Sequence, residues 1–175
     1  YAGQLQLCFA ENDLITVNMG IPRLAPAEIP LDTQQESRFY TLEINGVEKA
    51  FGAVSMGNPH AVLQVNDIKT APVCELGAIL ECHPFFPERV NVGFMQVIDR
   101  NNILLRVYER GAAETLACGS GACAAVVIGI EQNQLDRDVN VELPGGKLVI
   151  NWKGRGEPVF MSGPAVSVFD GSIAI

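Results

Sequence analysis

The sequence predicts an α+β fold in which a curved, mostly antiparallel sheet is wrapped around one buried central helix. Two observations carry this prediction. Most of the 175 residues fall into short segments rich in β-branched and aromatic residues, separated by turn-forming residues, which is typical of strands. Residues 122–130 are all apolar or glycine, and a helix without a polar stripe is typically buried on every side. One such helix packed against a sheet is an α+β arrangement.

Strands are expected along most of the chain. They are the two apolar runs within residues 5–19, the hairpin of residues 40–54, residues 61–65, residues 90–98, residues 103–109 and the hairpin of residues 139–152. A turn at residues 11–13 separates the first two runs. Asn45-Gly46 favours a two-residue turn in the first hairpin, and Pro-Gly-Gly at residues 144–146 turns the second. The proline-rich residues 22–30 form a connecting loop, and short strands continue to the C-terminus.

Two helices are expected. The first is amphipathic, with Thr70 as its N-cap and Pro72 near its first turn. Its apolar stripe consists of Val73, Leu76, Ile79 and Leu80. The second covers residues 122–130, where three β-branched residues at 126–128 leave a strand possible. Its length and its alanine-rich start favour a helix.

Composition excludes several classes of function. The chain has 12 basic and 20 acidic residues and a net charge of −8, which argues against nucleic acid or an anionic membrane as the main partner. No stretch approaches the roughly 18 consecutive apolar residues of a membrane span. The five cysteines contain no CxxC pair, so neither a disulfide framework nor a metal site is expected. Free thiols favour a reducing cytoplasm.

Cys118, within Ala-Cys-Gly-Ser-Gly at residues 117–121, is the strongest candidate for chemistry. It stands where a turn meets the buried helix, and the first N–H groups of a helix have no internal partner and carry partial positive charge. These groups are expected to lower the pKa of Cys118 and to bind the carboxylate of a small substrate. The alternative is that Cys118 is a small core residue, as most free cysteines are.

Glu109 and Arg110 end a strand shortly before Cys118. Adjacent strand residues point to opposite faces, so both can serve one site only if the strand ends there, and Gly111 favours such an end. Glu109 can then hold an ammonium group, while Arg110 can bind a carboxylate. An ordinary surface pair is an equally good interpretation.

Asn58, His60 and Asn91 complete the set of candidates. His60 is the residue best able to move a proton near neutral pH. It follows Asn58-Pro59 at the start of a strand, although Asn-Pro is also an ordinary turn sequence. Asn91 is a polar residue among apolar ones, and by itself it is an ordinary strand residue.

Taken together, these segments resemble diaminopimelate epimerases, the pyridoxal-independent amino-acid epimerases of lysine and peptidoglycan-precursor synthesis. The matching segments are residues 56–60 (MGNPH), 87–94 (PERVNVGF), 108–111 (YERG), 117–123 (ACGSGAC), 141–146 (VELPGG) and 162–165 (SGPA). They span nearly the whole chain in the expected order. The resemblance implies epimerisation of LL- to meso-diaminopimelate without a cofactor.

The resemblance implies a two-base mechanism. One cysteine thiolate removes the α-proton from one face of the substrate, and a second cysteine thiol protonates the other face. Cys118 matches the second, C-terminal cysteine, and the N–H groups of Gly119 and Ser120 would hold the α-carboxylate. Glu109 would contact the α-ammonium group, and His60 would assist acid–base chemistry at the partner cysteine.

The distal amino-acid end of the substrate would be recognised by Asn58, Asn91 and Arg110. An α-proton is very weakly acidic, so its removal needs fixed N–H dipoles that stabilise the carbanion. Two preplaced proton carriers must take the proton from the α-carbon and return one to it. Inversion needs those carriers on opposite faces of the carbon, and one cysteine is not enough.

The family's other cysteine lies in an N-terminal domain, in a Cys-Gly-Asn-Gly turn that has no counterpart here. We therefore expect this chain to be the C-terminal portion of a cytoplasmic enzyme, inactive alone. Residues 19–163 are expected to form the C-terminal domain. Residues 1–18 and 164–175 are expected to be strands of the N-terminal domain. The full-length enzyme is compatible with a homodimer.

Two alternatives stay open. One is a related isomerase of the same fold, either proline racemase-like or phenazine-biosynthesis-like. Asn91 and Arg110, which suit a distal carboxylate and ammonium, favour diaminopimelate over proline. The other is a non-catalytic fragment that uses the Gly-Ser-Gly helix start only to bind carboxylates.

Overall fold

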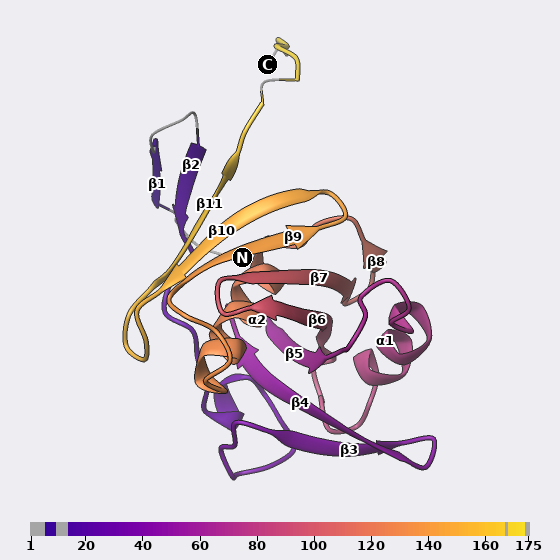
Figure 1. Cartoon of the computed structure of the whole chain (residues 1–175). Coiled ribbons are helices and arrows are strands. Elements are labelled where there is room, and N and C mark those ends of the chain that lie inside the picture. Colours follow the sequence, from indigo (N-terminus) through magenta and orange to yellow (C-terminus); the bar gives the residue numbers. More distant parts are fainter. Residues whose placement is uncertain (1–5, 10–13, 167, 174–175) are drawn as a thin grey trace.

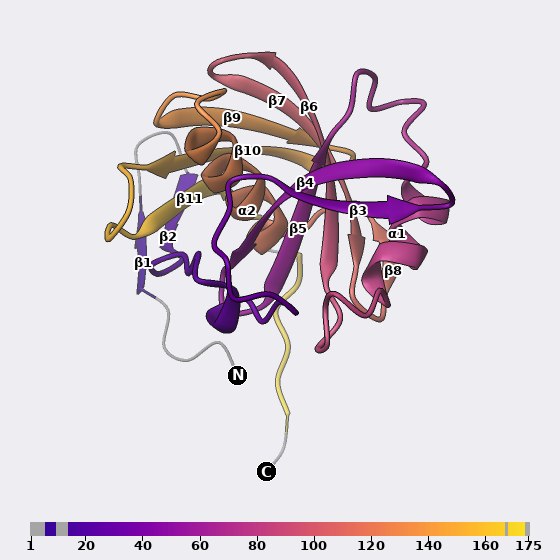
Figure 2. The same cartoon turned by 90° about the horizontal axis from the view of Figure 1, so that it is seen from below.

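The computed structural model describes residues 6–9, 14–166 and 168–173, and Figures 1 and 2 show it in two views. Within this part the chain forms one eleven-stranded sheet and two α-helices. The strands are β1 (Gln6–Phe9), β2 (Leu14–Asn18), β3 (Tyr40–Ile44), β4 (Val47–Ser55), β5 (Pro59–Gln64), β6 (Asn91–Asp99), β7 (Asn102–Glu109), β8 (Ala113–Thr115), β9 (Asp138–Leu143), β10 (Gly146–Trp152) and β11 (Val159–Pro164). The helices are α1 (Val73–Glu81), α2 (Gly119–Glu131) and a short 3-10 helix, η2 (Pro26–Glu28).

The sheet is mixed and mostly antiparallel. Its strand order is β1-β2-β11-β10-β9-β7-β6-β5-β4-β3, and β8 pairs with β7 outside this path. Of the strand pairs in the described part, two are parallel, β5 with β6 and β7 with β9. Each of these two connections contains an α-helix, as parallel neighbours require a long crossover. The α+β class predicted from the sequence is confirmed.

The middle of the sheet is buried on both faces. Along β5, Ala61 and Leu63 pack in a cluster that contains residues of α1, whereas Val62 packs in a cluster that contains residues of α2. Phe94 and Met95 of β6 divide between the two clusters in the same way. Because successive strand residues point to opposite faces, α1 and α2 lie on opposite sides of the sheet.

The segment after Cys118 is a helix, and the strand alternative is wrong. Residues 121–129 of α2 are buried, and the helix contacts β4, β5, β6, β7, β10 and β11. The contact with β4 is so close that a Cβ on Gly52 would lie 2.3 Å from Cγ2 of Ile128. Cys123, within the same helix, is 0% exposed and is a core residue, as expected.

The start of α1 differs from the expectation. Its N-cap is Pro72, which makes no side-chain capping bond. Thr70 does not cap the helix, because its hydroxyl lies 3.2 Å from Oδ2 of Asp67 and is used within the preceding turn. Of the apolar stripe, Val73 and Leu80 are buried, whereas Ile79 is 40% exposed.

Both expected hairpins are present. Asn45 and Gly46 join β3 to β4 with φ angles of 52° and 77°, the left-handed conformations that a type I′ turn requires. The turn between β9 and β10 packs against the chain just before Cys118. The Gly145 N–H donates to the Leu116 carbonyl at 2.7 Å, and a Cβ on Gly145 would lie 2.9 Å from that oxygen. Only glycine fits there without displacing the backbone.

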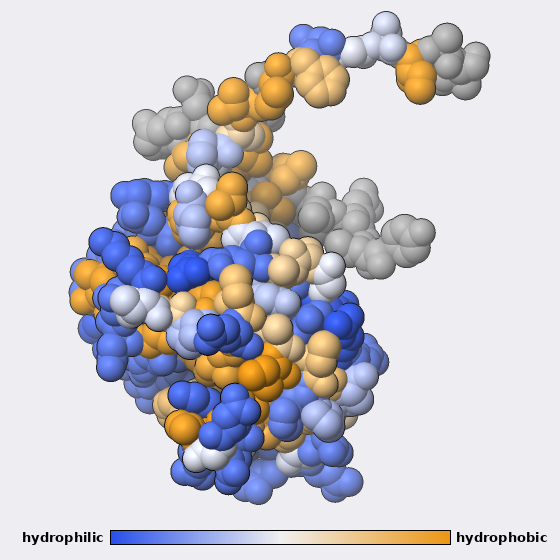
Figure 3. All heavy atoms as spheres, turned by 90° about the vertical axis from the view of Figure 1, so that its right-hand side faces the viewer, coloured by the Kyte–Doolittle hydropathy of each residue, from blue (hydrophilic) through white to orange (hydrophobic). Residues whose placement is uncertain are grey.

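The first strands join the rest of the sheet through β11. β2 pairs with β11, and the hydroxyls of Thr16 and Ser162 lie 2.7 Å apart. The expected turn at residues 11–13 lies outside the described residues. Beyond β11, the described residues carry no strand, and their large apolar side chains are 82–88% exposed. These side chains are Val166, Val168, Phe169 and Ile173. Figure 3 shows hydrophobic residues along this extended segment.

Neither helix of the described part has the length and apolar character that crossing a bilayer would need.

Candidate active site

Cys118 is the N-cap residue of α2. Its backbone is extended, with φ −143° and ψ 106°, and its carbonyl accepts the N–H of Ala122 at 2.9 Å. Cys118 is almost buried at 5% exposure, whereas Leu116, two residues before it, is 72% exposed. Gly119 and Ser120 are the first two helical residues, and N–H groups at these positions have no partner inside a helix. The predicted helix start beside Cys118 is confirmed.

The Glu109 carboxylate binds the Cys118 thiol. Sγ of Cys118 donates to Oε2 of Glu109 at 3.3 Å, and Oε1 accepts the hydroxyl of Thr115 at 2.5 Å. The hydroxyl of Ser120 lies 3.7 Å from the same sulfur. Glu109 is the last residue of β7, so the strand ends where the sequence predicted. Both carboxylate oxygens are thereby held in place.

Burial raises the pKa of the Cys118 thiol, so the expectation of a lowered pKa is wrong. The Ser120 hydroxyl and the Gly121 N–H lower this pKa, while the charge of Glu109 and its hydrogen bond to the thiol raise it. The helix start does favour the thiolate, but removing the sulfur from water outweighs it. Cys118 is therefore a protonated thiol at neutral pH, which is the form that can donate a proton.

His60 is buried in β5 at 1% exposure. Its Nε2 lies 3.1 Å from Oδ1 of Asn58, an atom that only accepts, so Nε2 carries the ring proton. Burial, together with the smaller effect of the positive charge of Arg110, lowers the pKa of His60 to about 3. The expectation that His60 exchanges protons near neutral pH is therefore wrong. It remains a neutral ring that can donate and accept hydrogen bonds.

Asn91 connects the ends of two strands. Its Nδ2 donates to the Pro59 carbonyl at 2.9 Å, and its Oδ1 accepts the Arg110 N–H at 3.0 Å. Asn91 and His60 are also register partners across β6 and β5. The guanidinium of Arg110 donates to the Glu88 carbonyl at 2.8 Å. Asn91 thus fixes the backbone of Arg110.

The predicted residues therefore fall into two hydrogen-bonded groups. One contains Cys118, Glu109 and Ser120 at the start of α2, where Gly119 also lies. The other contains Asn58, His60, Asn91 and Arg110 at the ends of β5, β6 and β7. The groups adjoin because Arg110 directly follows Glu109.

Two residues of this region were not predicted from the sequence. Thr115 reaches Glu109 because β8 folds back on β7, with Val107 opposite Thr115 and Glu109 on the same face. The glycine at 111 is the signal that marks this turn. Glu81, the last residue of α1, accepts the Gly111 N–H at 2.7 Å. No local sequence pattern predicts this contact.

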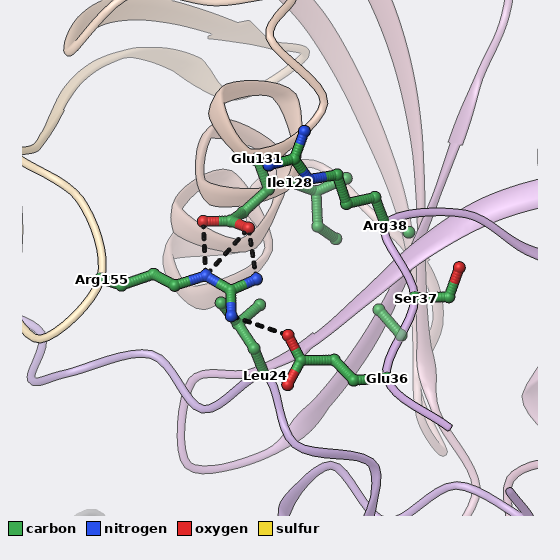
Figure 4. Close-up of a pocket in the computed structure, with 9 residues that line it drawn as sticks. Leu24, Glu36, Ser37, Arg38, Ile128, Glu131 and Arg155 are labelled. Carbon is green, nitrogen blue, oxygen red and sulfur yellow. Dashed lines mark hydrogen bonds and ion pairs between the residues drawn. The ribbon is translucent and has the colours of Figure 1, made fainter. Parts of the chain in front are cut away.

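A pocket lies at the C-terminal end of α2, away from Cys118 (Figure 4). There the guanidinium of Arg155 lies between two carboxylates, 2.6 Å from Glu131 and 2.7 Å from Glu36. Within the described residues, no group of three or more His, Cys, Asp or Glu side chains is placed to hold a metal ion.

Comparison with known sequences identifies close relatives. The family model described as Diaminopimelate epimerase matches residues 52–168. The chain is 54% identical over 173 residues to the Diaminopimelate epimerase of Stutzerimonas stutzeri (strain A1501), covering 99% of this chain and 63% of that protein. It is 57% identical over 175 residues to the Diaminopimelate epimerase of Thioalkalivibrio sulfidiphilus (strain HL-EbGR7), with the same 99% and 63% coverage. The chain thus spans 63% of the length of both relatives.

Solved structures share the fold. The chain matches a hydroxyproline epimerase from Agrobacterium vitis, crystallised with trans-4-OH-L-proline, with a TM-score of 0.64 and 12% sequence identity. The match covers 92% of this chain and 57% of that one. At this identity the likeness shows the fold alone.

Proposed function

The chain belongs to the diaminopimelate epimerase family, and on this premise we propose that it supplies one of two proton carriers that invert the α-carbon of diaminopimelate from LL to meso. One observation carries the proposal. The Cys118 thiol, at the start of α2, donates a 3.3 Å hydrogen bond to Glu109. A proton donor, a carboxylate for an ammonium group and helix amides for a carboxylate thereby meet at one point.

The proposed reaction moves one proton off the α-carbon and another onto it. A cysteine thiolate outside this chain takes the α-proton from one face of the substrate and becomes a thiol. Cys118 gives its S–H proton to the opposite face and becomes a thiolate. The reverse reaction exchanges the two roles. The raised pKa of Cys118 supports this assignment, because it keeps the donor form at neutral pH.

The charges of the substrate would be met by groups of fixed position. The N–H groups of Gly119 and Ser120 bind the α-carboxylate and stabilise the negative charge that spreads onto it when the proton leaves. Glu109 contacts the α-ammonium group. His60, as a neutral ring, assists the partner cysteine by hydrogen bonding, since with a pKa of about 3 the ring does not take up a second proton near neutrality.

The distal amino-acid end would be recognised by Asn58, Asn91 and Arg110. Arg110 offers a guanidinium that is exposed beside the site. The Asn91 amide already holds the Pro59 carbonyl and the Arg110 N–H, so it acts at least in part by orienting Arg110.

We also propose that residues 19–163 are the C-terminal domain of a longer enzyme, with α2 as the central helix wrapped by the curved sheet. Residues 1–18 and 164–175 would then pack with an N-terminal domain that carries the second cysteine. The 63% coverage of the relatives supports this, as do the exposed apolar side chains of Val166 and Phe169. The five free cysteines support a reducing cytoplasm, and the enzyme would be compatible with a homodimer.

The test uses the whole protein, meaning this chain joined to the part of its relatives that it does not span. LL-diaminopimelate is incubated in deuterated water, and meso product and α-deuterium are followed by NMR. C118A is expected to lose inversion by at least about 100-fold, since a general acid or base contributes roughly 10²–10⁴. C123A, which removes a core thiol five residues away, is the matched control and keeps inversion.

Inversion by C118A at the parent rate would exclude Cys118 as the proton donor. Proline serves as the competing substrate, and its racemisation instead of diaminopimelate would favour the related isomerases of the same fold. The 175-residue chain alone is expected to show no inversion.

A further inference from the structure

We infer that Glu81 is a positioning residue, which fixes the turn after Glu109 and thereby sets the contact between Glu109 and Cys118. Its effect on turnover rests on the proposed function. Its effect on the Cys118 thiol does not, and the two are measured separately below.

The carboxylate of Glu81 is buried, at 5% exposure, and both of its oxygens have polar neighbours. Oε1 accepts the Gly111 N–H at 2.7 Å and lies 3.3 Å from Nη2 of Arg89. Oε2 lies 3.8 Å from the Cys82 thiol. A buried carboxylate at the C-terminal end of a helix is unfavourable both for its lost hydration and for the helix dipole. An apolar side chain would serve packing alone better, which points to the bonds that Glu81 makes.

The Gly111 N–H is one of two consecutive backbone groups held directly after Glu109. The Arg110 N–H donates to Oδ1 of Asn91 at 3.0 Å, and the Gly111 N–H donates to Glu81. The two acceptors come from different elements, β6 and α1. Gly111 has φ +77°, so the chain reverses at the point where Glu81 binds it. Two side chains thereby clamp the end of β7.

The same turn also determines the second contact of the Glu109 carboxylate. The Ala112 N–H donates to the Glu109 carbonyl at 3.1 Å, and β8 begins at the next residue. β8 carries Thr115, whose hydroxyl binds Oε1 of Glu109. Releasing Gly111 from Glu81 therefore disturbs both the backbone of Glu109 and the hydroxyl that orients its carboxylate.

Glu131 provides a matched control. Like Glu81, it is the last residue of an α-helix and pairs with an arginine, and its side chain is 13% exposed. Its partner Arg155 also binds Glu36, as Figure 4 shows at the far end of α2 from Cys118. Loss of the Glu131–Arg155 ion pair removes a similar interaction from the fold and leaves the turn after Glu109 unchanged.

The first experiment measures alkylation of Cys118 by iodoacetamide as a function of pH, resolved by peptide mass spectrometry. Since the Glu109 charge disfavours the thiolate, displacing Glu109 makes Cys118 react at lower pH. E81L removes the hydrogen bond to Gly111 and the ion pair with Arg89, and it is expected to show this shift. E81Q keeps an oxygen for Gly111 without the charge and is expected to lie between E81L and the parent. E131Q is expected to match the parent.

A double variant separates positioning from general loosening of the fold. If Glu81 acts through Glu109, E81L adds no shift to the pH profile of E109Q. A further shift of the same size in the E109Q background would show that Glu81 acts on Cys118 by another route and would overturn the inference. If E81L does not fold, the test rests on the pH profile of Cys118 alkylation in E81Q. A profile in E81Q that equals the parent profile then overturns the inference.

The second experiment measures kcat and KM in the whole protein. E81L is expected to lower kcat about tenfold, because small displacements of a reacting group cost one to two orders of magnitude. E81Q should recover part of this loss, while E131Q keeps the parent kcat. If the parent itself does not epimerise diaminopimelate, the proposed function fails, and the alkylation profiles still decide the role of Glu81.

Discussion

Cys118 and Glu109 are joined by a 3.3 Å thiol–carboxylate hydrogen bond that links the start of α2 to the end of β7. The carboxylate accepts a hydrogen bond from the protonated thiol and so stabilises the uncharged sulfur, while its own charge disfavours the thiolate. The N–H groups at the helix start act in the opposite direction. The site therefore contains two opposing influences on one proton, and a bound ammonium group facing Glu109 would shift their balance.

Replacing Glu109 with glutamine is expected to lower the pKa of the Cys118 thiol, because the charge that opposes the thiolate is removed. Alkylation of Cys118 should then begin at lower pH. In the whole protein, the same change should lower turnover by roughly 100-fold, since a charged group beside the reacting centre is lost. Site-resolved mass spectrometry measures the first effect, and kinetics measure the second.

Replacing Ser120 with alanine is expected to raise the pKa of the Cys118 thiol, the opposite of the change in E109Q, because the Ser120 hydroxyl lowers this pKa. Cys123, whose pKa burial raises to about 12, is an internal reference that should stay unreactive in the folded protein. A Cys118 profile that moves to higher pH in E109Q would contradict the electrostatic account.

His60 should make the protein less stable as the pH falls. Its pKa is lowered from 6.5 in the unfolded chain to about 3 in the folded protein, so between these values the unfolded state binds more protons. The free energy of unfolding should therefore fall with decreasing pH across this window, by up to about 1.4 kcal/mol per pH unit from His60. H60Q should lack this contribution. Urea unfolding at several pH values measures the difference between the two slopes.

H83Q, which removes a histidine from the loop after α1, is the control for the loss of an imidazole. Equal slopes in H60Q and the parent would show that His60 is protonated in the folded state at mildly acidic pH.

Ala113 adopts a left-handed conformation, with φ +61°, at the start of β8. This conformation costs a residue with a Cβ roughly 1–2 kcal/mol. Replacing Ala113 with glycine removes this cost, but part of the gain in stability is offset because glycine has more conformational freedom in the unfolded chain. A113G is therefore expected to raise the free energy of unfolding by roughly 0.5–1 kcal/mol. A112G, at a neighbouring residue without a positive φ, should lower it. Thermal and urea unfolding of the two variants should differ in sign.

Much of the fold could be predicted from local sequence. Asn45-Gly46 has the backbone angles that its turn type demands, and the unbroken apolar run after Cys118 forms helix α2, in which residues 121–129 are buried. β8 was missed because three residues are too few to show a strand period. The N-cap of α1 was misplaced because the Thr70 hydroxyl donates to the Asp67 carboxylate and does not accept an N–H of the helix.

For the candidate site, the sequence predicted residues that the structure places in two adjoining hydrogen-bonded groups, but it did not predict their protonation. Burial decides the pKa of both Cys118 and His60, and local sequence does not report the depth of a side chain within the fold. Thr115 and Glu81 were missed for a related reason. Each reaches the Glu109 turn from an element whose packing is set by long-range contacts.

The contact between Gly145 and Leu116 limits where the chain can be opened to create new termini. Both the Asn45-Gly46 turn and the turn at Gly145 are exposed, and exposed turns are the usual places to open a chain for circular permutation or to insert another domain. Gly46 has no neighbour within 4 Å of an added Cβ, so new termini there would disturb nothing nearby. New termini at Gly145 would break the hydrogen bond to the Leu116 carbonyl. The segment that leads to Cys118 would then lose a contact that holds it in position.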